Sequence, residues 1–401
     1  MGLRKVRLGE IASFVADKVR SDNITLAEYV TTDSLLQNKA GRTIAQNLPP
    51  QPCSLTRYKS GDVLVGNIRP YLKKIWLADG GGGCSNDVLA FRAKEGFSSS
   101  FLYAILSQDT FFDYLMLAAK GSKMPRGDKD HAMRFKVPFF PIEQQRRIGK
   151  LLSDIDRKIA LNRRMNATLE AMARQLYDYW FVQFDFPDAH GKPYKSSGGK
   201  MTWNDKLKRN IPEGWSVIPL HDGVEVQYGF PFSTDLFVES ETGYPVVRIR
   251  DILDGTTSAY TTEVPDAKYQ ILRGDVIVGM DGNFHMNFWH TDTTFLNQRC
   301  VRLRAQSNSR IAAMQVYFDI KPYIKAKELN AKGSTVGHLS DKDIKSLYLI
   351  KPSDSQTFNP RPTFDAILSK MVSCRVQITT LTRLRSTLLP LLMNGQVEVC
   401  R

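Results

Sequence analysis

The 401-residue sequence is poor in cysteine and has no long apolar run. Its five cysteines stand far apart, without a CxxC pair, at Cys53, Cys84, Cys300, Cys374 and Cys400. This scatter indicates reduced thiols rather than a disulfide framework or a zinc site. No stretch approaches the roughly eighteen apolar residues of a membrane-spanning helix, and no lipidation motif is present. We therefore expect a cytoplasmic protein without a membrane anchor.

The sequence also lacks the motifs of enzymes that modify or cleave nucleic acids. The Asp/Asn/Ser-Pro-Pro-Tyr/Phe motif of amino-methyltransferases is absent, because the Pro-Pro pair of Leu48–Gln51 has other neighbours. The phosphate loop G-x-x-x-x-G-K-S/T is absent too, since no lysine follows Gly80–Gly83. His285, His290 and Asp292 lack the tight spacing of metal ligands. These absences favour a chain with no catalytic centre, metal or cofactor of its own.

Positive charge is in excess. Lysine and arginine number 55 against 41 acidic residues, a net charge of +14, and the excess is spread along the chain. Such a distribution indicates a basic folded surface rather than a disordered arm. Nucleic acid is the expected polyanionic partner. An anionic membrane is the alternative, but no basic amphipathic anchor is present.

Residues 142–184 contain no proline and no glycine after Gly149, so nothing should break a helix there. Apolar and amide side chains recur at alternating steps of four and three residues, at Ile148, Leu152, Ile155, Ile159, Asn162, Asn166, Leu169, Ala173, Leu176 and Trp180. This heptad pattern predicts one long helix packed against another helix. At ~1.5 Å per residue the helix would be about 60 Å long. The two asparagines lie in the seam, where buried amides can fix the register.

The rest of the chain divides around this helix. Residues 1–141 mix short strand-like runs with turns, and residues 215–352 do so again. Residues 185–214, which begin with a stretch rich in Pro, Gly and Ser, are typical of a linker. Residues 353–401 contain a second helix with a similar seam, which Pro390 should kink or end.

The two mixed segments repeat each other. Ser60–Gly66 (SGDVLVG) recurs as Arg273–Gly279 (RGDVIVG), and Asp128–Asp130 recurs as Asp341–Asp343, each at an offset of 213 residues. A shared offset over this length indicates a duplicated unit. The chain is therefore predicted to run domain, helix, domain, helix.

Two such units can pair their long helices antiparallel, which gives the chain an approximate internal two-fold symmetry. Dimeric DNA readers bind half-sites whose spacing is set by protein geometry. Because the two copies differ in sequence, the two half-sites should differ as well. The architecture predicts recognition of a bipartite, asymmetric DNA site.

Four segments stand out as motifs: Leu161–Ala173 (LNRRMNATLEAMA) with Trp180–Val182 (WFV) in the central helix, Leu388–Val397 (LLPLLMNGQV) at the end of the distal helix, Ile211–Trp215 (IPEGW) before the second mixed segment, and Gly61–Leu72 (GDVLVGNIRPYL) in the first. These segments resemble the specificity subunits of type I restriction–modification enzymes, and the resemblance covers essentially the whole chain. The central-helix signature is the most specific of these.

The resemblance implies an α+β fold with two mixed α/β target-recognition domains, at 1–141 and 215–352. Two long antiparallel coiled-coil-like helices, the central one at 142–184 and the distal one in 353–401, would separate them in a pseudo-two-fold internal repeat. It also implies a non-catalytic reader of double-stranded DNA. Two modification (methyltransferase) subunits would bring S-adenosylmethionine, and restriction subunits would bring ATP- and Mg-dependent translocation and cleavage. The central helix would space the domains and dock partners, with candidate residues Asn162, Arg163, Arg164, Asn166, Trp180 and Phe181.

DNA contacts are expected from loop side chains, since guanidinium and amide groups read base edges and ammonium groups hold phosphates. The first copy offers Arg69, Tyr71, Lys73, Lys74, Ser122, Lys123, Arg126 and Lys129. The second copy offers Arg248, Arg250, Asn283, His285, Asn287, Ser334, Thr335 and His338. Arg248 and Arg250 are expected on one face of a strand, unless acids pair with them. Because Met280–Asn283 stands where the first copy has Asn67–Pro70, the contacts should not transfer one to one.

Two other functions remain open on the sequence alone. The first is a stand-alone DNA-binding regulator, which would bind its site without a methyltransferase partner. The second is a nucleic-acid enzyme with a degenerate site, which would show methylation or nuclease activity as an isolated chain.

Overall fold

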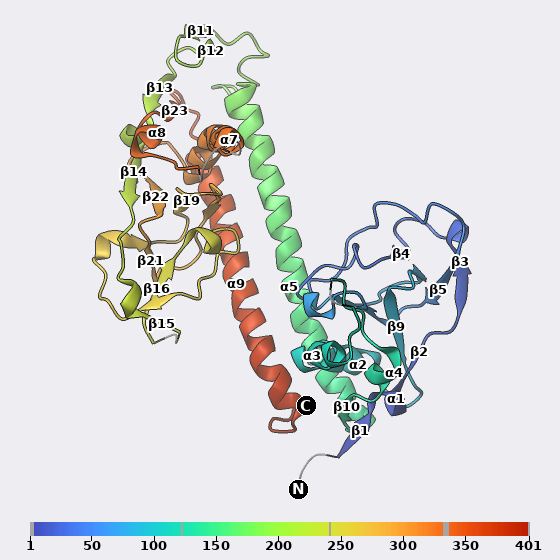
Figure 1. Ribbon diagram of the computed structural model, residues 1–401. Helices are drawn as coiled ribbons and strands as arrows, with labels where there is room; N and C mark the ends of the chain where they lie inside the picture. Colours follow the sequence, from blue (N-terminus) through green and yellow to red (C-terminus); the bar gives the residue numbers. More distant parts are fainter. Residues whose placement is uncertain (1–3, 122, 240–241, 332–336, 400–401) are drawn as a thin grey trace. The chain divides into compact units, whose positions relative to one another are not determined.

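The computed structural model describes residues 4–121, 123–239, 242–331 and 337–399 (Figure 1). The chain forms two compact units. Unit 1 consists of Met1–Ile159 and Thr380–Arg401, and unit 2 consists of Ala160–Thr379. Each unit therefore contains one mixed segment together with part of each long helix.

Unit 1 is built on two four-stranded sheets. The first has the order β2 (Ala12–Phe14), β9 (Val88–Ala93), β6 (Val63–Gly66), β7 (Ile75–Leu77) and is antiparallel throughout. The second has the order β3 (Lys18–Arg20), β5 (Ser54–Tyr58), β8 (Gly82–Cys84), β4 (Tyr29–Val30), with β4 parallel to β8. The remaining elements are the pair β1 (Lys5–Arg7) and β10 (Lys136–Pro138) and the helices α1 (Leu8–Ile11), α2 (Ser99–Leu106), α3 (Asp109–Leu117) and α4 (Lys129–Met133).

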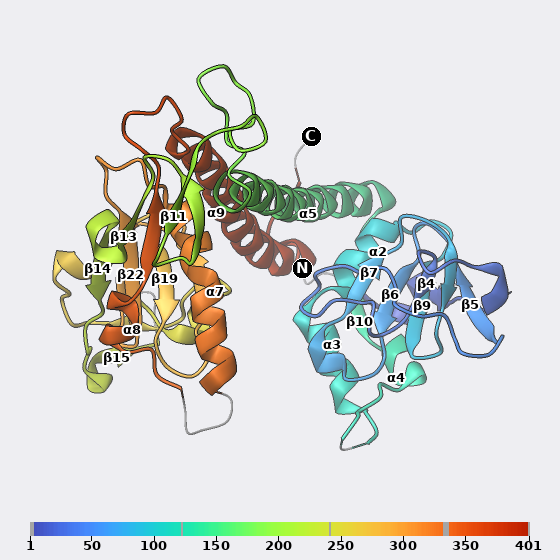
Figure 2. The ribbon, with the colours of Figure 1, turned by 90° about the horizontal axis from the view of Figure 1, so that it is seen from above.

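Unit 2 repeats this plan. Its antiparallel sheet has the order β14 (Val224–Tyr228), β22 (Cys300–Ala305), β19 (Val276–Gly279), β20 (Met286–Phe288). The other sheet has the order β15 (Phe237–Val238), β17 (Tyr260–Thr261), β16 (Tyr244–Val247), β21 (Thr294–Leu296), β18 (Gln270–Ile271), with β16 parallel to β21. The pair β13 (Ser216–Pro219) and β23 (Tyr348–Lys351) and the helices α6 (Leu220–Gly223), α7 (Ala313–Ala331) and α8 (Asp341–Lys345) complete it. Figure 2 shows α7 lying along the β14–β22–β19–β20 sheet.

The repeated Gly-Asp-Val-x-Val-Gly motif forms the middle strands β6 and β19, and both faces of each are buried. In β6, Val63 and Val65 face the helices α2 and α3, while Leu64 faces the second sheet. In β19, Val276 and Val278 share a core with α7, while Ile277 faces the other way. Successive side chains of a strand point to opposite faces, so a strand covered on both sides is apolar throughout. This explains the uninterrupted apolar run of the motif.

An ion pair fixes the turn before each of these strands in the same way. In unit 1 the Asp62 carboxylate accepts two hydrogen bonds from Arg92, at 2.8 and 2.7 Å. In unit 2 Asp275 accepts two from Arg304, at 2.8 and 2.7 Å. Both carboxylates are buried, and each also caps the backbone N–H of the residue three before it. The predicted internal repeat is confirmed down to these side chains.

The long helices α5 (Ile142–Tyr177) and α9 (Arg361–Met393) form as predicted, and a π-helical turn, Asp178–Val182, ends the first. In unit 2 the Asn162 Nδ2 donates to the Gln377 Oε1 at 3.0 Å, and Met165 meets Cys374. In unit 1 Asp156 pairs with Arg385 at 2.6 Å. Within unit 2 the contacts rise along α5 as they fall along α9, so the helices pack antiparallel, as predicted. The seam is confirmed, because every one of its ten residues is buried or half-buried.

One expectation needs correction and a second is narrowed. Residues 185–214 are folded rather than a loose linker: they form the hairpin β11 (Met201–Asn204) and β12 (Arg209–Pro212). Phe186 from this segment is buried and stacks on Trp215 at 4.7 Å between ring centroids, so apolar burial holds it in place. Of the two outcomes expected at Pro390, a kink or an end of the helix, the structure excludes the end, because α9 continues to Met393. The carbonyl left without its N–H partner belongs to Ser386, which is exposed and can bind water.

Candidate nucleic-acid interface

In each unit, the loop after the middle strand is joined to a second loop by one isolated backbone bridge. In unit 1 the bridge links Ile68 to Arg126, and in unit 2 it links Asp281 to His338. The Arg69 N–H donates to the Pro125 carbonyl at 2.7 Å, and the Leu339 N–H donates to the Met280 carbonyl at 2.7 Å. We call this feature the loop joint. It brings the two candidate stretches of each copy together, although their sequences differ.

The loop joint of unit 1 is conformationally strained. Arg69 and Lys73 both have φ of 51° and flank a single 3-10 turn, Pro70–Leu72. Asn38 and Lys39, at φ of 54° and 61°, donate their backbone N–H groups to the carbonyls of Leu72 and Lys73. Non-glycine residues in this region cost about 1–3 kcal/mol each and concentrate at functional sites. Four such residues packed together therefore mark this loop as a candidate site.

Several lysines of this site are already engaged by the protein. Asp109 accepts from Lys39 at 2.7 Å and pairs with Lys73 at 2.8 Å. Burial lowers the pKa of Lys39; burial also opposes ionisation of Asp109, but these two ammonium groups hold the Asp109 pKa below its ordinary value. The Lys74 ammonium donates to the Thr32 carbonyl. These contacts hold the loop rigid and leave its other side chains to face outward.

The remaining candidates of unit 1 are Arg69, Tyr71 and the residues of the second loop. Tyr71 is 51% exposed. The Arg69 Nε is buried and has no hydrogen-bond partner among the described residues. Lys123 is exposed, and Arg126 is exposed while it pairs with Asp87 at 2.5 Å.

The last two candidates of unit 1 are Lys129 and Ser122. Lys129 begins α4, and its ammonium lies 6.0 Å from the centroid of the Phe14 ring. The predicted contact Ser122 lies outside the described residues.

In unit 2 the expected strand at Arg248 and Arg250 is wrong. Strand β16 ends at Val247, and Ile249–Asp251 forms a 3-10 turn. The Asp251 carboxylate causes the turn by accepting from the Arg248 backbone N–H at 3.0 Å and from its Nε at 3.1 Å. Arg248 is thus paired with an acid, which was the alternative considered. Arg250 is exposed and its guanidinium has no partner in the described part of the chain.

An open hollow of about 830 Å³ brings the unit 2 candidates together. Its charged residues, its histidine and one of its amides come from the turn after β16, the loop after β19 and the loop before β22: Arg248, Arg250, Asp281, Asn283, His285 and Arg299. On its rim the His338 Nδ1 lies 2.6 Å from the Asp281 Oδ1, and Arg299 lies 3.8 Å from the same carboxylate. The geometry therefore gathers five of the candidates in one place.

The remaining candidates of unit 2 are Asn287, which is hydrogen-bonded within the protein, and Ser334 and Thr335. The Asn287 amide donates to the carbonyls of Ile252 and Leu253 at 3.0 and 3.1 Å, and its oxygen accepts from Arg375 at 2.7 Å. The same oxygen also accepts from the Phe288 N–H at 2.9 Å. The expected DNA contact of Asn287 stays a prediction, because it would have to break or share these four hydrogen bonds. Ser334 and Thr335 lie outside the described residues.

The docking candidates on the central helix divide by burial. Phe181 is 0% exposed and Trp180 is 9% exposed, and both pack on Phe364 in the unit 2 core. Asn162 is 1% exposed within the seam. These three side chains therefore pack inside the chain itself, and their role in docking a partner stays a prediction. Asn166 is half-buried, and its Oδ1 has no partner among the described residues.

An exposed face of the central helix remains available for partners. Arg163 and Arg164 are exposed. Large apolar side chains on the same segment are exposed as well: Leu161, Met172, Tyr179 and Val182. Exposed apolar groups in a cluster typically mark an interaction surface.

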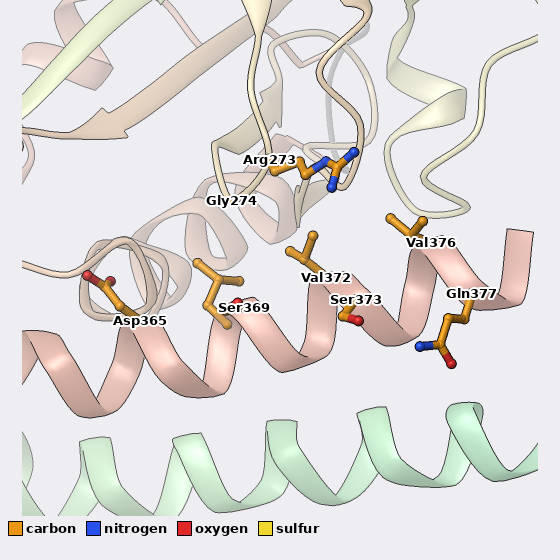
Figure 3. Close-up of a pocket in the computed structure, with 9 residues that line it drawn as sticks. Arg273, Gly274, Asp365, Ser369, Val372, Ser373, Val376 and Gln377 are labelled. Carbon is orange, nitrogen blue, oxygen red and sulfur yellow. The ribbon is translucent and has the colours of Figure 1, made fainter.

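A second, smaller hollow of about 420 Å³ lies in unit 2 against α9. Figure 3 shows the turn with Arg273 and Gly274 above the face of α9 that carries Ser369 and Val372. Its charges are already matched, because Arg273 pairs with Asp292 at 2.7 Å. We therefore assign this hollow no DNA contact.

Within residues 4–121, 123–239, 242–331 and 337–399, no three His, Cys, Asp or Glu side chains gather as metal ligands would. No helix in the same ranges is long and apolar enough to span a membrane.

Sequence reasoning missed Lys39, Asp87 and Arg299. Lys39 reaches the site from a segment far from the motif, so no local pattern reveals it. Asp87 and Arg299 occupy equivalent positions, since their carbonyls accept the N–H groups of Asn67 and Met280 respectively. The repeat offset of 212 would have paired them.

The comparisons with known proteins agree with this geometry. The family model of the type I restriction modification DNA specificity domain matches residues 4–171 and again residues 212–357. The MjaIX specificity subunit of a type I restriction enzyme from Methanocaldococcus jannaschii is 23% identical over 384 residues, covering 94% of this chain and 86% of that protein. The HindI specificity subunit from Haemophilus influenzae is 20% identical over 461 residues, covering 98% and 99%.

A solved structure shows the same fold. The crystal structure of the S subunit of a type I restriction–modification system from M. genitalium aligns with a TM-score of 0.58 at 15% identity, covering 98% of this chain and 96% of that one. Because the family model matches both copies of the repeat and most of the chain, the protein belongs to the type I restriction–modification DNA specificity family, as a specificity subunit and not a catalytic one.

Proposed function

We propose that this specificity subunit reads a bipartite, asymmetric DNA site, one half with each unit. The observation that carries the proposal is the loop joint, which has the same backbone bridge in both units and different side chains. One backbone frame places side chains in the same way in each copy, while the different side chains give each copy its own sequence preference. The two half-sites therefore differ.

In unit 1 we assign base contacts to Arg69, Tyr71 and Arg126, and a phosphate contact to Lys123. A guanidinium can donate two hydrogen bonds to guanine O6 and N7, which is the commonest specific contact in the major groove. Lys73, Lys74 and Lys129, with Ser122, bind phosphates and so fix the register of the protein on the duplex.

In unit 2 we assign base contacts to Asn283, His285 and His338, and a phosphate contact to Arg250, supported by Arg248. An amide can pair with adenine N6 and N7, so this half-site should be richer in adenine contacts. Asn287, Ser334 and Thr335 are secondary candidates.

We further propose that two modification subunits dock on the exposed face of the central helix around Arg163 and Arg164, in the cytoplasm. They bring S-adenosylmethionine, and restriction subunits bring ATP and Mg. The chemistry is then supplied by partners, and the present chain directs it to a site.

The test is to co-express the chain with its modification subunit and map methylated bases genome-wide. The expected result is one two-part motif whose halves differ and are separated by unspecified bases. A stand-alone regulator would bind its site as a purified chain and would direct no methylation. Methylation without any sequence motif would contradict the proposal.

A further inference from the structure

The hollow of unit 2 has three polar side chains that the protein itself does not use. Within the described residues, the side chains of Arg250, Asn283 and His285 make no hydrogen bond and no ion pair. They come from two different segments, the turn after β16 and the loop after β19, and line one space. Polar groups that converge on a hollow without partners are typical of a ligand site.

The lining of the hollow also includes apolar and aromatic side chains. Phe232, Phe237 and Ile249 line it, and Phe232 is buried. An aromatic ring beside a cationic group suits a nucleobase, because bases stack on aromatic faces and their phosphates bind guanidinium groups. The volume of about 830 Å³ falls in the ordinary range of small-molecule pockets, about 300–1,000 Å³.

The charge on the rim allows an anion to enter. Asp281 is the acidic residue of the lining, and its carboxylate lies 3.8 Å from Arg299 and 2.6 Å from the His338 Nδ1. Asp251, the neighbour of Arg250, pairs with Arg248, and Arg250 makes no ion pair with a described residue. A phosphate near Arg250 and Arg299 therefore meets a net positive field.

Unit 1 does not offer the same groups at the equivalent positions. Asp87 stands where unit 2 has Arg299, as their identical backbone contacts show. By the repeat offset of 213, Pro70 stands where unit 2 has Asn283. An acid and a proline replace a cation and an amide, so this chemistry belongs to unit 2.

We propose that the unit 2 hollow binds a single purine nucleotide, with the base between Phe237 and the edges of Asn283 and His285, and the phosphate on Arg250 and Arg299. The nucleotide has two possible sources: a free purine mononucleotide, or a purine unstacked from the DNA half-site. The second source rests on the proposed function, and the first does not.

The first experiment measures binding of dAMP and of dGMP to the purified full-length chain by calorimetry. The double variant Arg250→Ala/Arg299→Ala should bind at least tenfold more weakly than the wild type. The control variant Arg57→Ala/Lys59→Ala removes the same charge from exposed positions of unit 1 and should bind as the wild type does. Equal weakening by both variants would mean nonspecific attraction and would overturn the site. Unfolding curves of all three proteins verify that each is folded.

The second experiment places 2-aminopurine in turn at each adenine of the second half-site, once methylation mapping has given its sequence. The wild-type complex, with DNA saturated, should raise the fluorescence at one position as the base unstacks. The complex containing Arg250→Ala/Arg299→Ala, also saturated, should lose that rise. A positive result in either experiment supports the proposal. Binding in the calorimeter without a fluorescence rise identifies a free nucleotide as the ligand, and a fluorescence rise identifies a base of the DNA.

The proposal is overturned if the wild type binds neither mononucleotide at millimolar concentration and no 2-aminopurine position responds while the duplex is bound specifically. That result leaves the proposed bipartite recognition intact. If instead the chain directs no sequence-specific methylation, the proposed function fails, and the calorimetric arm still decides whether the hollow takes a nucleotide.

Discussion

At the scale of single residues, Arg69 has the strongest argument for reading a base. Its backbone is held at a φ of 51° by neighbouring loops, and its buried Nε lacks a partner among the described residues. We predict that Arg69→Lys weakens specific binding by about 1–3 kcal/mol, because lysine keeps the charge and loses the two-pronged donor. Binding to unrelated DNA should stay within about twofold.

The measurement for Arg69 is a competition assay against half-site variants of the methylated motif. Relaxed discrimination at one base of one half-site is the expected outcome. Lys123→Ala, an exposed loop lysine, is the control, and it should weaken specific and nonspecific binding together while lowering the salt dependence. Unchanged discrimination in Arg69→Lys would remove this residue from the set of base readers.

Asp319 gives a prediction about stability. Its carboxylate accepts from the Tyr177 hydroxyl at 2.7 Å and from Gln315 and the Ile350 N–H at 3.3 Å, inside unit 2. Burial raises the pKa of Asp319 from 3.8 to about 7. Because the folded state holds the proton more tightly than the unfolded state, the contribution of Asp319 to the free energy of unfolding is greatest below pH 4. It is lost as the pH rises toward 7.

In the wild type, the free energy of unfolding should therefore fall between pH 4 and pH 7 because of Asp319. We expect the substitution Asp319→Asn to abolish this fall. The size of that fall is on the order of 4 kcal/mol at most. Urea unfolding of the variant and the wild type at several pH values measures it as a difference. Asp254→Asn, an exposed position in the same unit, is the control. Parallel curves for wild type and Asp319→Asn would show that the carboxyl is ionised in both states.

At the scale of elements, the long helices were predictable and the loops were not. The seam from Ile148 to Trp180 follows from apolar spacing alone, because helix packing needs only the right period. The turn at Arg248 was missed, since one carboxylate, Asp251, ends β16 there. The loop joint could not be predicted from the sequence for a related reason. Its bridges are made by backbone groups, so Asn67–Pro70 and Met280–Asn283 do the same work with different side chains.

The continuous helix α5 crosses the boundary between the two units at Ile159 and Ala160, and α9 crosses it at Thr379 and Thr380. We propose that these helices set the spacing of the half-sites. Inserting four residues into both helices at these points should add ~6 Å and ~40° of rotation. A base pair of DNA spans ~3.4 Å and ~35°.

The four-residue insertion should therefore favour a spacer longer by one or two base pairs, with both half-sites unchanged. Some loss of thermal stability is expected, because four residues break the heptad and locally unwind the pair. The methylated motif of the insertion variant, mapped with its modification subunit, is the measurement. Full activity on the original spacer would show that the helices do not measure this distance.

At the scale of the whole molecule, duplication explains both what the sequence reveals and what it conceals. The ion pairs Asp62–Arg92 and Asp275–Arg304 recur because each fixes the turn into a buried strand, and any copy of this sheet needs it. Tyr71 and Arg250 have no such counterpart, since groups that face DNA are free to change with the sequence recognised. The repeated fold can therefore be predicted from one sequence. The full set of residues at the candidate site is found only from the structure, and Lys39 is the clearest example.

The central claim is that each unit reads its own half of the site. The most direct test replaces residues 1–141 with the corresponding segment of another family member and maps methylation with the modification subunit present. The account predicts that one half of the motif changes to that of the donor, while the other half and the spacer stay the same. Contradiction would come from a folded, methylating hybrid in which both halves change or in which neither does.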